Sequence, residues 1–232
     1  NKKLFYIEEL CNIDNFNNAN DNLKIMLKEY KKRIELLKNN GYSVSPVHIN
    51  ERVLKALLPS YMVISCTEAS SNYSNLNGII FGPRSKGKTF EEVMMNARTK
   101  GFCSLIKRRF IIGSYSLEKE NKEKYFLNAK RIRRMVTDIM EDFFKEYDGL
   151  IMPVGNGCIP KIGEENKYNN ALEEAFDNNL IIGNFGGFPS ITLPVGMINN
   201  YPFAINITSN RKEDKKLLNI ANDIENIIGG DK

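Results

Sequence analysis

The sequence predicts an α/β protein. Three observations carry this prediction. The chain opens on a strand, a helix and a second strand, later strands alternate with long amphipathic helices, and 42% of the 232 residues are hydrophobic, enough to bury a core. No apolar run approaches the roughly 20 residues that cross a bilayer, which argues against a membrane protein. The pattern shows neither repeats nor an obvious linker, so we expect one domain or one large fragment of a domain, and the start at Asn1 instead of Met favours the fragment.

The first half of the chain has clear start and stop signals. A helix begins at Asp21 or Asn22, keeps apolar residues at helical spacing and ends at Asn40 before a glycine. The loop at 78–88 is rich in Gly and Lys, but it lacks the spacing of a phosphate-binding P-loop. The other expected elements are strands at Lys3–Ile7 and Tyr42–Ile49, a helix at Glu51–Leu58 broken before Pro59, and a helix or buried segment at Tyr61–Asn72.

The second half predicts longer helices and three more strands. The longest helix runs from about Glu123 to Tyr147, and Arg133 interrupts its apolar stripe. A guanidinium on a buried face requires a carboxylate or carbonyl partner, so we predict that Arg133 is a structural anchor. The remaining expected elements are helices at Thr89–Lys100, Phe102–Ile112, near Ala171–Phe176 and at Lys215–Ile228, and strands at Gly149–Pro153, Ser190–Val195 and Phe203–Thr208.

The basic residues are concentrated in one stretch. The chain has 33 Lys and Arg against 28 Asp and Glu, and Arg98–Arg134 alone holds twelve basic residues against three Glu. Such a stretch either contacts phosphates or forms a solvated helical face. Aromatic rings between the charges would favour RNA, and no known RNA motif accompanies them. The rings within the stretch are Phe102, Phe110, Tyr115, Tyr125 and Phe126.

The cysteines and the single histidine do not form a metal-binding pattern. Cys11, Cys66, Cys103 and Cys158 are far apart, without a closely spaced pair, so a zinc site is not expected. A Cys/His enzyme would have to use His48, which stands in a strand-like stretch typical of a structural or surface histidine. Scattered cysteines favour a reducing compartment, either the cytoplasm or an organelle matrix.

Several segments, taken in order, resemble one family. They resemble the A subunits of glutamyl-tRNA(Gln) amidotransferases, which are amidase-signature enzymes. The resemblance covers nearly the whole chain, so it is far more specific than any one match. The segments are Tyr61–Asn72 (YMVISCTEASSN), Gly101–Phe102, Ile106–Tyr115 (IKRRFIIGSY), Ala129–Arg133 (AKRIR), Tyr147–Asp148 and Asn184–Gly196 (NFGGFPSITLPVG).

The resemblance implies an amidase-signature fold, with a mixed central sheet covered by helices on both faces. Residues 1–232 would form the C-terminal portion of a single such domain. The family activates a nucleophilic serine through a second serine and a lysine, within a segment of the form GGSSGGS. That segment is absent from these residues, and the pair Ser70–Ser71 has no flanking glycines to form an oxyanion hole. We therefore assign no catalytic residue here, and we expect the chain by itself to be inactive.

The resemblance also implies where glutamine binds. Family members hold the α-carboxylate of glutamine with an arginine and its α-amino group with an aspartate, which correspond to Arg109 and Asp177. A guanidinium suits a carboxylate because it donates two parallel hydrogen bonds. Arg108 remains an alternative to Arg109, and Tyr61 corresponds to a tyrosine near the amidase site. The structural alternatives are a surface arginine, a polar residue at a helix end and, for Tyr61, a core aromatic.

The implied reaction has three participants. The A subunit releases ammonia from glutamine through an acyl-serine intermediate, and a channel leads the ammonia to a B subunit. There Glu-tRNA(Gln) is converted to Gln-tRNA(Gln) with ATP and Mg²⁺, while a small C subunit commonly clamps the other two together. ATP, Mg²⁺ and most tRNA contacts would belong to the B subunit, so no cofactor or metal is expected in this chain.

The chain departs from the family at three places, which leaves other functions open. The departures lie at 80–84, 116–126 and 153–160. Another amidase-signature hydrolase is one alternative, although Arg109 and Asp177 suit an amino-acid substrate better than a hydrophobic amide. A degenerate amidase domain that serves as a scaffold or an RNA-associated module is the other.

Overall fold

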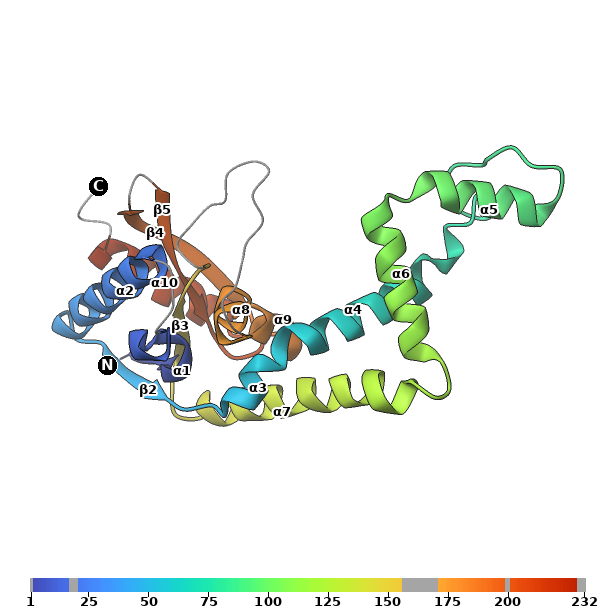
Figure 1. Cartoon of the computed structure of the whole chain (residues 1–232). Coiled ribbons are helices and arrows are strands. Elements are labelled where there is room, and N and C mark those ends of the chain that lie inside the picture. The colour runs from blue at the N-terminus through green and yellow to red at the C-terminus, as the bar shows by residue number, and fades with distance from the viewer. Residues whose placement is uncertain (1, 17–20, 156–170, 199–200, 229–232) are drawn as a thin grey trace. The chain divides into compact units, whose positions relative to one another are not determined.

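The computed structural model describes residues 2–16, 21–155, 171–198 and 201–228 (Figure 1). These residues form two compact units. The sheet unit comprises Asn1–Leu58 and Ile132–Lys232, and the helical unit comprises Pro59–Arg131. Each unit has its own contacts and is described by itself.

The sheet unit is built on a mixed five-stranded sheet in the order β2-β1-β3-β5-β4. Strand β1 pairs in parallel with both β2 and β3, whereas β5 is antiparallel to β3 and β4. The predicted α/β class is therefore confirmed, and each predicted strand is present. Their bounds are β1 Lys3–Ile7, β2 Ser43–Val47, β3 Gly149–Pro153, β4 Ser190–Ile198 and β5 Tyr201–Thr208.

Helices cover both faces of this sheet, as strand β1 demonstrates. Tyr6 packs edge-on against Tyr30 of helix α2, with ring centroids 6.2 Å apart, whereas the neighbouring Phe5 packs 5.3 Å from Phe143 of helix α7. Successive side chains of a strand point to opposite faces, so α2 and α7 lie on opposite sides of the sheet. The helices of this unit are α1 Glu8–Cys11, α2 Asp21–Asn39, α3 Glu51–Lys55, most of α7 Asn128–Phe143, α8 Ala171–Asp177, α9 Ile181–Gly186 and α10 Asp214–Ile228, with a 3₁₀ turn at Ile13–Phe16.

The helical unit contains no strand, and all of its residues are described. A loop at 76–89 separates its first two long helices, and Thr89 caps the second of them by accepting a hydrogen bond from the backbone of Glu92 (3.3 Å). The elements are α4 Leu57–Asn72, a 3₁₀ turn at Tyr73–Asn75, α5 Phe90–Gly101, α6 Ser104–Leu117 and a π-helical segment at Lys122–Leu127.

Several predicted boundaries were wrong, for local reasons. The expected break before Pro59 falls at Ala56 instead, because proline is tolerated in the first turn of a helix, and α4 begins at Leu57. The helix predicted over 123–147 is a π-helical segment followed by α7. Two short helices, α1 and α9, were not predicted, since neither is long enough to show a period.

The side chain of Arg133 is exposed, so its predicted burial was wrong, although Ala129 and Val136 on the same face of α7 are buried. Its predicted partner type is confirmed, because Nε donates a hydrogen bond to the carbonyl of Phe185 in α9 (3.1 Å). Thr137, one turn later on α7, is also within hydrogen-bonding distance of that carbonyl (3.4 Å). Arg133 thus ties α7 to α9 within the sheet unit.

Within the described ranges, no helix has the length and apolar character needed to span a membrane.

Candidate functional site

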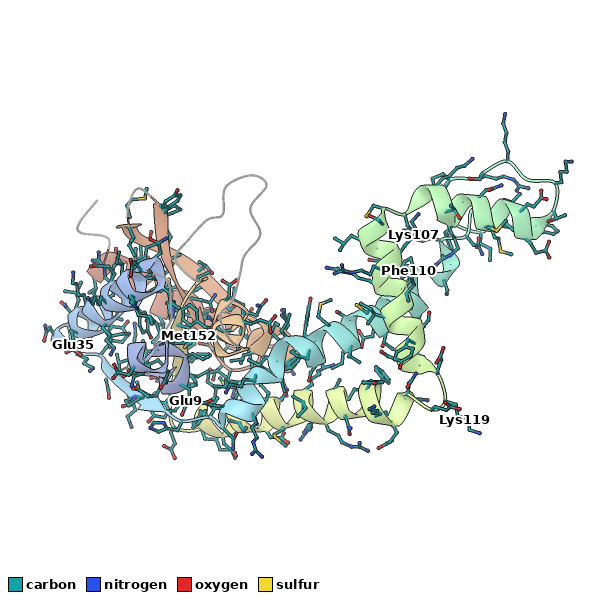
Figure 2. All side chains as sticks on the ribbon, viewed as in Figure 1. Glu9, Glu35, Lys107, Phe110, Lys119 and Met152 are labelled. Carbon is teal, nitrogen blue, oxygen red and sulfur yellow. The ribbon has the colours of Figure 1, made fainter. Side chains whose placement is uncertain are left out.

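Two of the segments that carry the family resemblance, Tyr61–Asn72 and Ile106–Tyr115, form a tight helix crossing in the helical unit. Gly113 of α6 lies against α4 so closely that a Cβ atom there would stand 2.1 Å from the carbonyl oxygen of Cys66 and 2.3 Å from the hydroxyl of Ser70. The Ser70 hydroxyl lies 2.8 Å from the Cys66 carbonyl and 3.2 Å from the carbonyl of Phe110. Figure 2 labels Phe110 on α6. Gly113 and Ser70 therefore fix how α6 lies on α4.

This crossing positions the two candidate arginines. Arg109 stands one turn before Gly113, and Arg108 lies about 100° further round the helix. Both side chains are exposed, and no ion pair or hydrogen bond of either guanidinium occurs among the described residues. Ile111, one turn after Arg108, is 70% exposed, so Arg108 lies on the more open side of α6.

Tyr61 and Asp177 lie in different units. Tyr61 is half-buried in the second turn of α4, so it shares the helical unit with both arginines. Asp177 is the last residue of α8 in the sheet unit and is half-buried. A Cβ atom at Gly155 would lie 3.6 Å from the Asp177 carboxylate, so this side chain lies beside the chain that leaves β3.

Asn179 holds the end of α8 against the end of β3, and sequence reasoning missed it. Its buried amide donates to the carbonyl of Pro153 (3.1 Å) and to that of Phe176 (2.7 Å). The ring of Phe176 packs edge-on against Phe16, 5.9 Å between centroids. Ligands in α/β proteins commonly bind at the carboxyl ends of strands, and Asp177 lies at such an end. In the sequence, the two Asn residues that follow Asp177 are the one feature that could have indicated the contact of Asn179 with β3, and such a pair is a weak indication.

Two candidate nucleophiles, Ser70 and Cys11, and the histidine His48 have structural contacts, whereas Cys103 is exposed. Ser70 is held between two backbone carbonyls, as described above. Cys11 is 1% exposed, and burial raises the pKa of its thiol well above the usual range, so the thiolate is disfavoured. His48 places Nδ1 2.9 Å from a carboxylate oxygen of Glu9, whose other oxygen accepts the backbone N–H of Ile49 (3.1 Å). Across the described residues, no three His, Cys, Asp or Glu side chains are placed to hold a metal ion. Cys158 lies outside the described residues.

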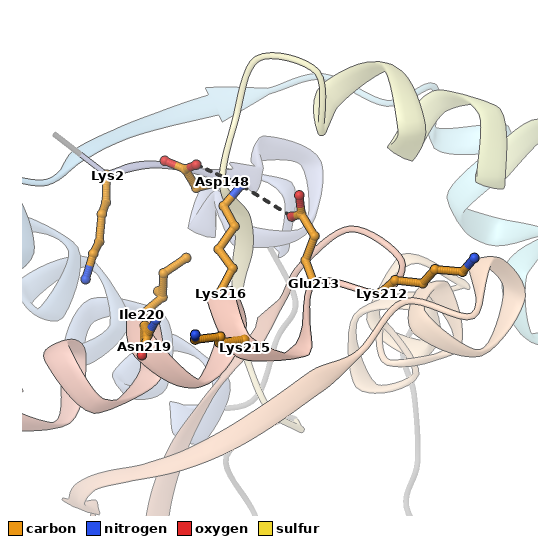
Figure 3. Close-up of a pocket in the computed structure, with 8 residues that line it drawn as sticks. All are labelled: Lys2, Asp148, Lys212, Glu213, Lys215, Lys216, Asn219 and Ile220. Carbon is orange, nitrogen blue, oxygen red and sulfur yellow. Dashed lines mark ion pairs between the residues drawn. The ribbon is translucent and has the colours of Figure 1, made fainter.

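A pocket of about 490 Å³ lies beside the start of α10 in the sheet unit (Figure 3). None of the predicted site residues lines it. The Lys216 ammonium lies 2.9 Å from the carboxylate of Asp148 and 3.3 Å from that of Glu213, and the Lys2 ammonium lies 3.0 Å from Asp223. These ion pairs tie α10 to the start of β1 and to the chain before β3, so we interpret the pocket as a structural contact. We call the pairs of Lys216 with Asp148 and Glu213 and of Lys2 with Asp223 the α10 ion-pair cluster.

Acid is expected to weaken the α10 ion-pair cluster. Burial by itself raises the pKa of Asp148, but hydrogen bonds from the Lys3 backbone and from Lys216 outweigh burial, and the pKa is lowered overall. A carboxylate with a lowered pKa stabilises the fold above its ordinary pKa, near 4, and loses this contribution as the pH falls through the folded-state value.

We expect Asp148→Asn to lower the free energy of unfolding at pH 7 by about 1 kcal/mol and to flatten its decrease between about pH 5 and pH 2. Urea unfolding across that pH range measures both effects. The exposed pair of Lys145 with Asp142 is the matched control, and Asp142→Asn should change little. If Asp148→Asn and the original chain showed the same pH dependence of the free energy of unfolding, Asp148 would not be the group that makes the fold sensitive to acid.

Comparisons with known proteins agree with the predicted resemblance. A family model described as Amidase matches residues 19–218. The A subunit of glutamyl-tRNA(Gln) amidotransferase from Mycoplasma genitalium is 32% identical over 203 residues, and the protein of that name from Mycoplasma pneumoniae is 34% identical. Each match covers 85% of this chain but only 42% of the relative, so the chain spans less than half the length of these proteins.

Solved structures show the same fold. The crystal structure of the glutamyl-tRNA(Gln) amidotransferase A subunit from Thermotoga maritima matches with a TM-score of 0.61 and 25% identity, over 93% of this chain and 40% of that one. A crystal structure of an amidase matches with a TM-score of 0.69 over 95% of this chain and 44% of the other. Its 17% identity supports the fold alone. The predicted resemblance, including the mixed sheet covered by helices, is therefore confirmed.

Proposed function

The chain belongs to the amidase family, and from that premise we propose that it is part of the glutaminase subunit of a tRNA-dependent amidotransferase. The observation that carries the proposal is the identity of 32% and 34% to two proteins named as the A subunit of glutamyl-tRNA(Gln) amidotransferase. In this proposal the chain supplies glutamine-binding residues and part of the subunit core. The complete enzyme would convert Glu-tRNA(Gln) to Gln-tRNA(Gln) with ammonia taken from glutamine.

The proposed glutamine contacts pair one residue with each charged group of the substrate. Arg109 binds the α-carboxylate of glutamine and Asp177 binds its α-amino group, which gives each charged group of the substrate an opposite charge. Two features support Arg109: its guanidinium is exposed without a described ion pair, and it stands one turn before the rigid contact at Gly113. Arg108 is the alternative carboxylate ligand, and Tyr61 borders the amidase site. The Arg109 and Asp177 contacts favour glutamine over the hydrophobic amides that other amidase-signature hydrolases accept.

The remaining chemistry belongs to other polypeptide segments in this proposal. The serine nucleophile, its partner serine and the lysine are supplied from outside residues 1–232, and the chain by itself is inactive. The B subunit carries ATP, Mg²⁺ and most of the contacts with Glu-tRNA(Gln), and the C subunit joins it to the glutaminase. The enzyme operates in the cytoplasm or in an organelle matrix.

The coding sequence upstream of residue 1 provides the first test. We expect an open frame that encodes a lysine followed by a segment rich in Gly and Ser of the form GGSSGGS. The complete glutaminase, assembled with the B and C subunits, should then produce Gln-tRNA(Gln) from glutamine and ATP, while residues 1–232 alone release no ammonia above background.

Two results would count against the proposal. A stop codon followed by a start codon next to residue 1 would favour a degenerate amidase-like scaffold. Hydrolysis of aryl amides by the complete protein, without partners or ATP and without activity on glutamine, would assign the chain to another amidase-signature hydrolase.

A further inference from the structure

The loop at 76–89 of the helical unit is held firmly on helix α5, along which it runs back before the helix begins (Figure 1). Two glycines permit this contact. A Cβ atom at Gly78, where φ is +76°, would lie 2.6 Å from the Cβ of Ala97, and one at Gly87 would lie 2.6 Å from the backbone nitrogen of Val93. The loop therefore touches α5 near both of its ends, where larger residues would push it away.

Hydrogen bonds reinforce both contacts. Near the start of the loop, Arg98 donates to the carbonyls of Tyr73 (2.8 Å) and Leu76 (3.3 Å). Near its end, the amide of Asn96 donates to the carbonyl of Lys86 (2.9 Å). The backbone N–H of Lys88 donates to the carboxylate of Glu92 (2.6 Å). A loop secured in this way presents its outward side chains in a defined arrangement.

The outward side chains are apolar and basic, and the apolar ones are Ile80, which is 69% exposed, and two aromatic rings. Phe81 is 57% exposed and Phe90 is 66% exposed, although burial of either ring would stabilise the unit. Between these two rings the chain places three cations at alternate positions, Arg84, Lys86 and Lys88. None of the three forms an ion pair or a side-chain hydrogen bond in this fully described unit.

The surroundings of the loop do not neutralise these charges. From residue 69 to residue 117 the chain holds eight Lys and Arg but only two acidic residues, Glu91 and Glu92. Glu92 already accepts the backbone of Lys88. Two other cations of this stretch point at backbone carbonyls, since Arg98 binds the start of the loop and Lys107 donates to Thr99 (2.9 Å). The positive charges of the loop are therefore available to bind an external anion.

We infer that this loop, residues 76–89, together with Phe90 at the start of α5, binds single-stranded RNA. Cations at alternate positions suit a chain of phosphates, and exposed aromatic rings at both ends suit unstacked bases. A protein partner with acidic side chains would satisfy the cations, but it would not explain why the exposed rings bracket them. The inference goes beyond the proposed function, which assigns most RNA contacts to the B subunit, and it does not depend on it.

Fluorescence anisotropy with a labelled single-stranded RNA of about 20 nucleotides tests the inference on the intact chain. The triple variant Arg84→Ala, Lys86→Ala, Lys88→Ala should bind at least about tenfold more weakly. The slope of log K against log salt should fall by about 2, because each lost phosphate contact removes about 0.7. The matched control is Lys28→Ala, Lys31→Ala, Lys32→Ala on α2, which removes the same charge from the sheet unit and should bind nearly as well as the original chain.

A second pair of variants tests the rings. Phe81→Leu and Phe90→Leu keep an apolar side chain but remove the stacking surface, so each should weaken binding of single-stranded RNA by about tenfold and leave binding of duplex RNA unchanged. Thermal melts confirm that each variant folds.

Equal losses of RNA binding in the loop triple variant and in the α2 control would overturn the inference, and so would unchanged RNA binding by the ring variants. It would also be overturned if an acidic peptide displaced the RNA and if both the triple variant and the ring variants bound that peptide more weakly. The last result would identify an acidic protein as the partner. Since the assay contains no glutamine, ATP or other polypeptide, its failure would leave the proposed amidotransferase function untouched.

Discussion

Arg109→Ala in the assembled amidotransferase is expected to raise the KM for glutamine about 100-fold. A guanidinium that binds a carboxylate through two charge-assisted hydrogen bonds contributes about 3 kcal/mol, and each 1.4 kcal/mol corresponds to a factor of ten. Ammonia supplied directly needs no glutamine, so amidation with ammonium chloride should continue at nearly the original rate. Steady-state assays with glutamine and with ammonia separate the two outcomes.

The neighbouring arginine provides the matched control. Arg108→Ala removes the same charge from the same turn of α6, but its side chain lies about 100° away around the helix. We expect it to change the KM for glutamine less than threefold. Arg109→Lys should recover only part of the affinity, because an ammonium group donates no bidentate pair.

Two patterns would contradict the assignment to Arg109. A large effect of Arg108→Ala together with a small effect of Arg109→Ala would transfer the carboxylate contact to Arg108. An equal loss of the glutamine-dependent and ammonia-dependent reactions would indicate a structural role, because both reactions require the folded protein and only one of them uses the glutamine site.

Gly113→Ala is expected to destabilise the helical unit by about 3 kcal/mol or more. The added methyl carbon would stand 2.1 Å from the carbonyl oxygen of Cys66, a backbone atom that cannot rotate away. Helices α4 and α6 would have to move apart, which would also strain the contact between the Ser70 hydroxyl and Phe110. Hydrogen exchange measured by mass spectrometry should show the loss of protection within 59–131, while the sheet unit keeps its protection.

Gly101→Ala is the control for this experiment. Gly101 is the last residue of α5, and a Cβ atom there would meet nothing within 4 Å. Alanine favours the helix by up to about 1 kcal/mol relative to glycine, so this variant should be neutral or slightly stabilising. Similar protection in the two variants would mean that α6 does not lie on α4 as described.

Local signals in the sequence were enough to locate most elements. Asp21, the helical spacing of apolar residues and Gly41, where φ is +89°, bound helix α2 nearly as predicted. Lys3–Ile7 and Gly149–Pro153 were predicted with their correct ends, because turns and polar residues flank both apolar runs. The signal failed at Pro59, because proline is compatible with the first turn of a new helix as well as with the end of an old one.

The candidate site was less accessible to sequence reasoning. The residue types of Arg109 and Asp177 indicate which charges of glutamine they suit, and the resemblance identified their positions. Nothing local showed that Gly113 is a helix-crossing contact or that Asn179 joins α8 to β3, since both facts involve residues far apart in the chain. The assignment of Arg109 over Arg108 remains a prediction that the variants above test.

The sequence by itself determined the kinds of elements, their approximate ends and the family, because propensity, apolar period and caps act over a few neighbouring residues. The tertiary structure decided the strand order β2-β1-β3-β5-β4, the close approach of Gly113 to Cys66 and the attachment of the loop at 76–89 to α5. Each of these depends on side chains that meet across long separations in the sequence. Such contacts form because packing and hydrogen bonding offset the entropy of closing the chain between them, and no local pattern records that balance.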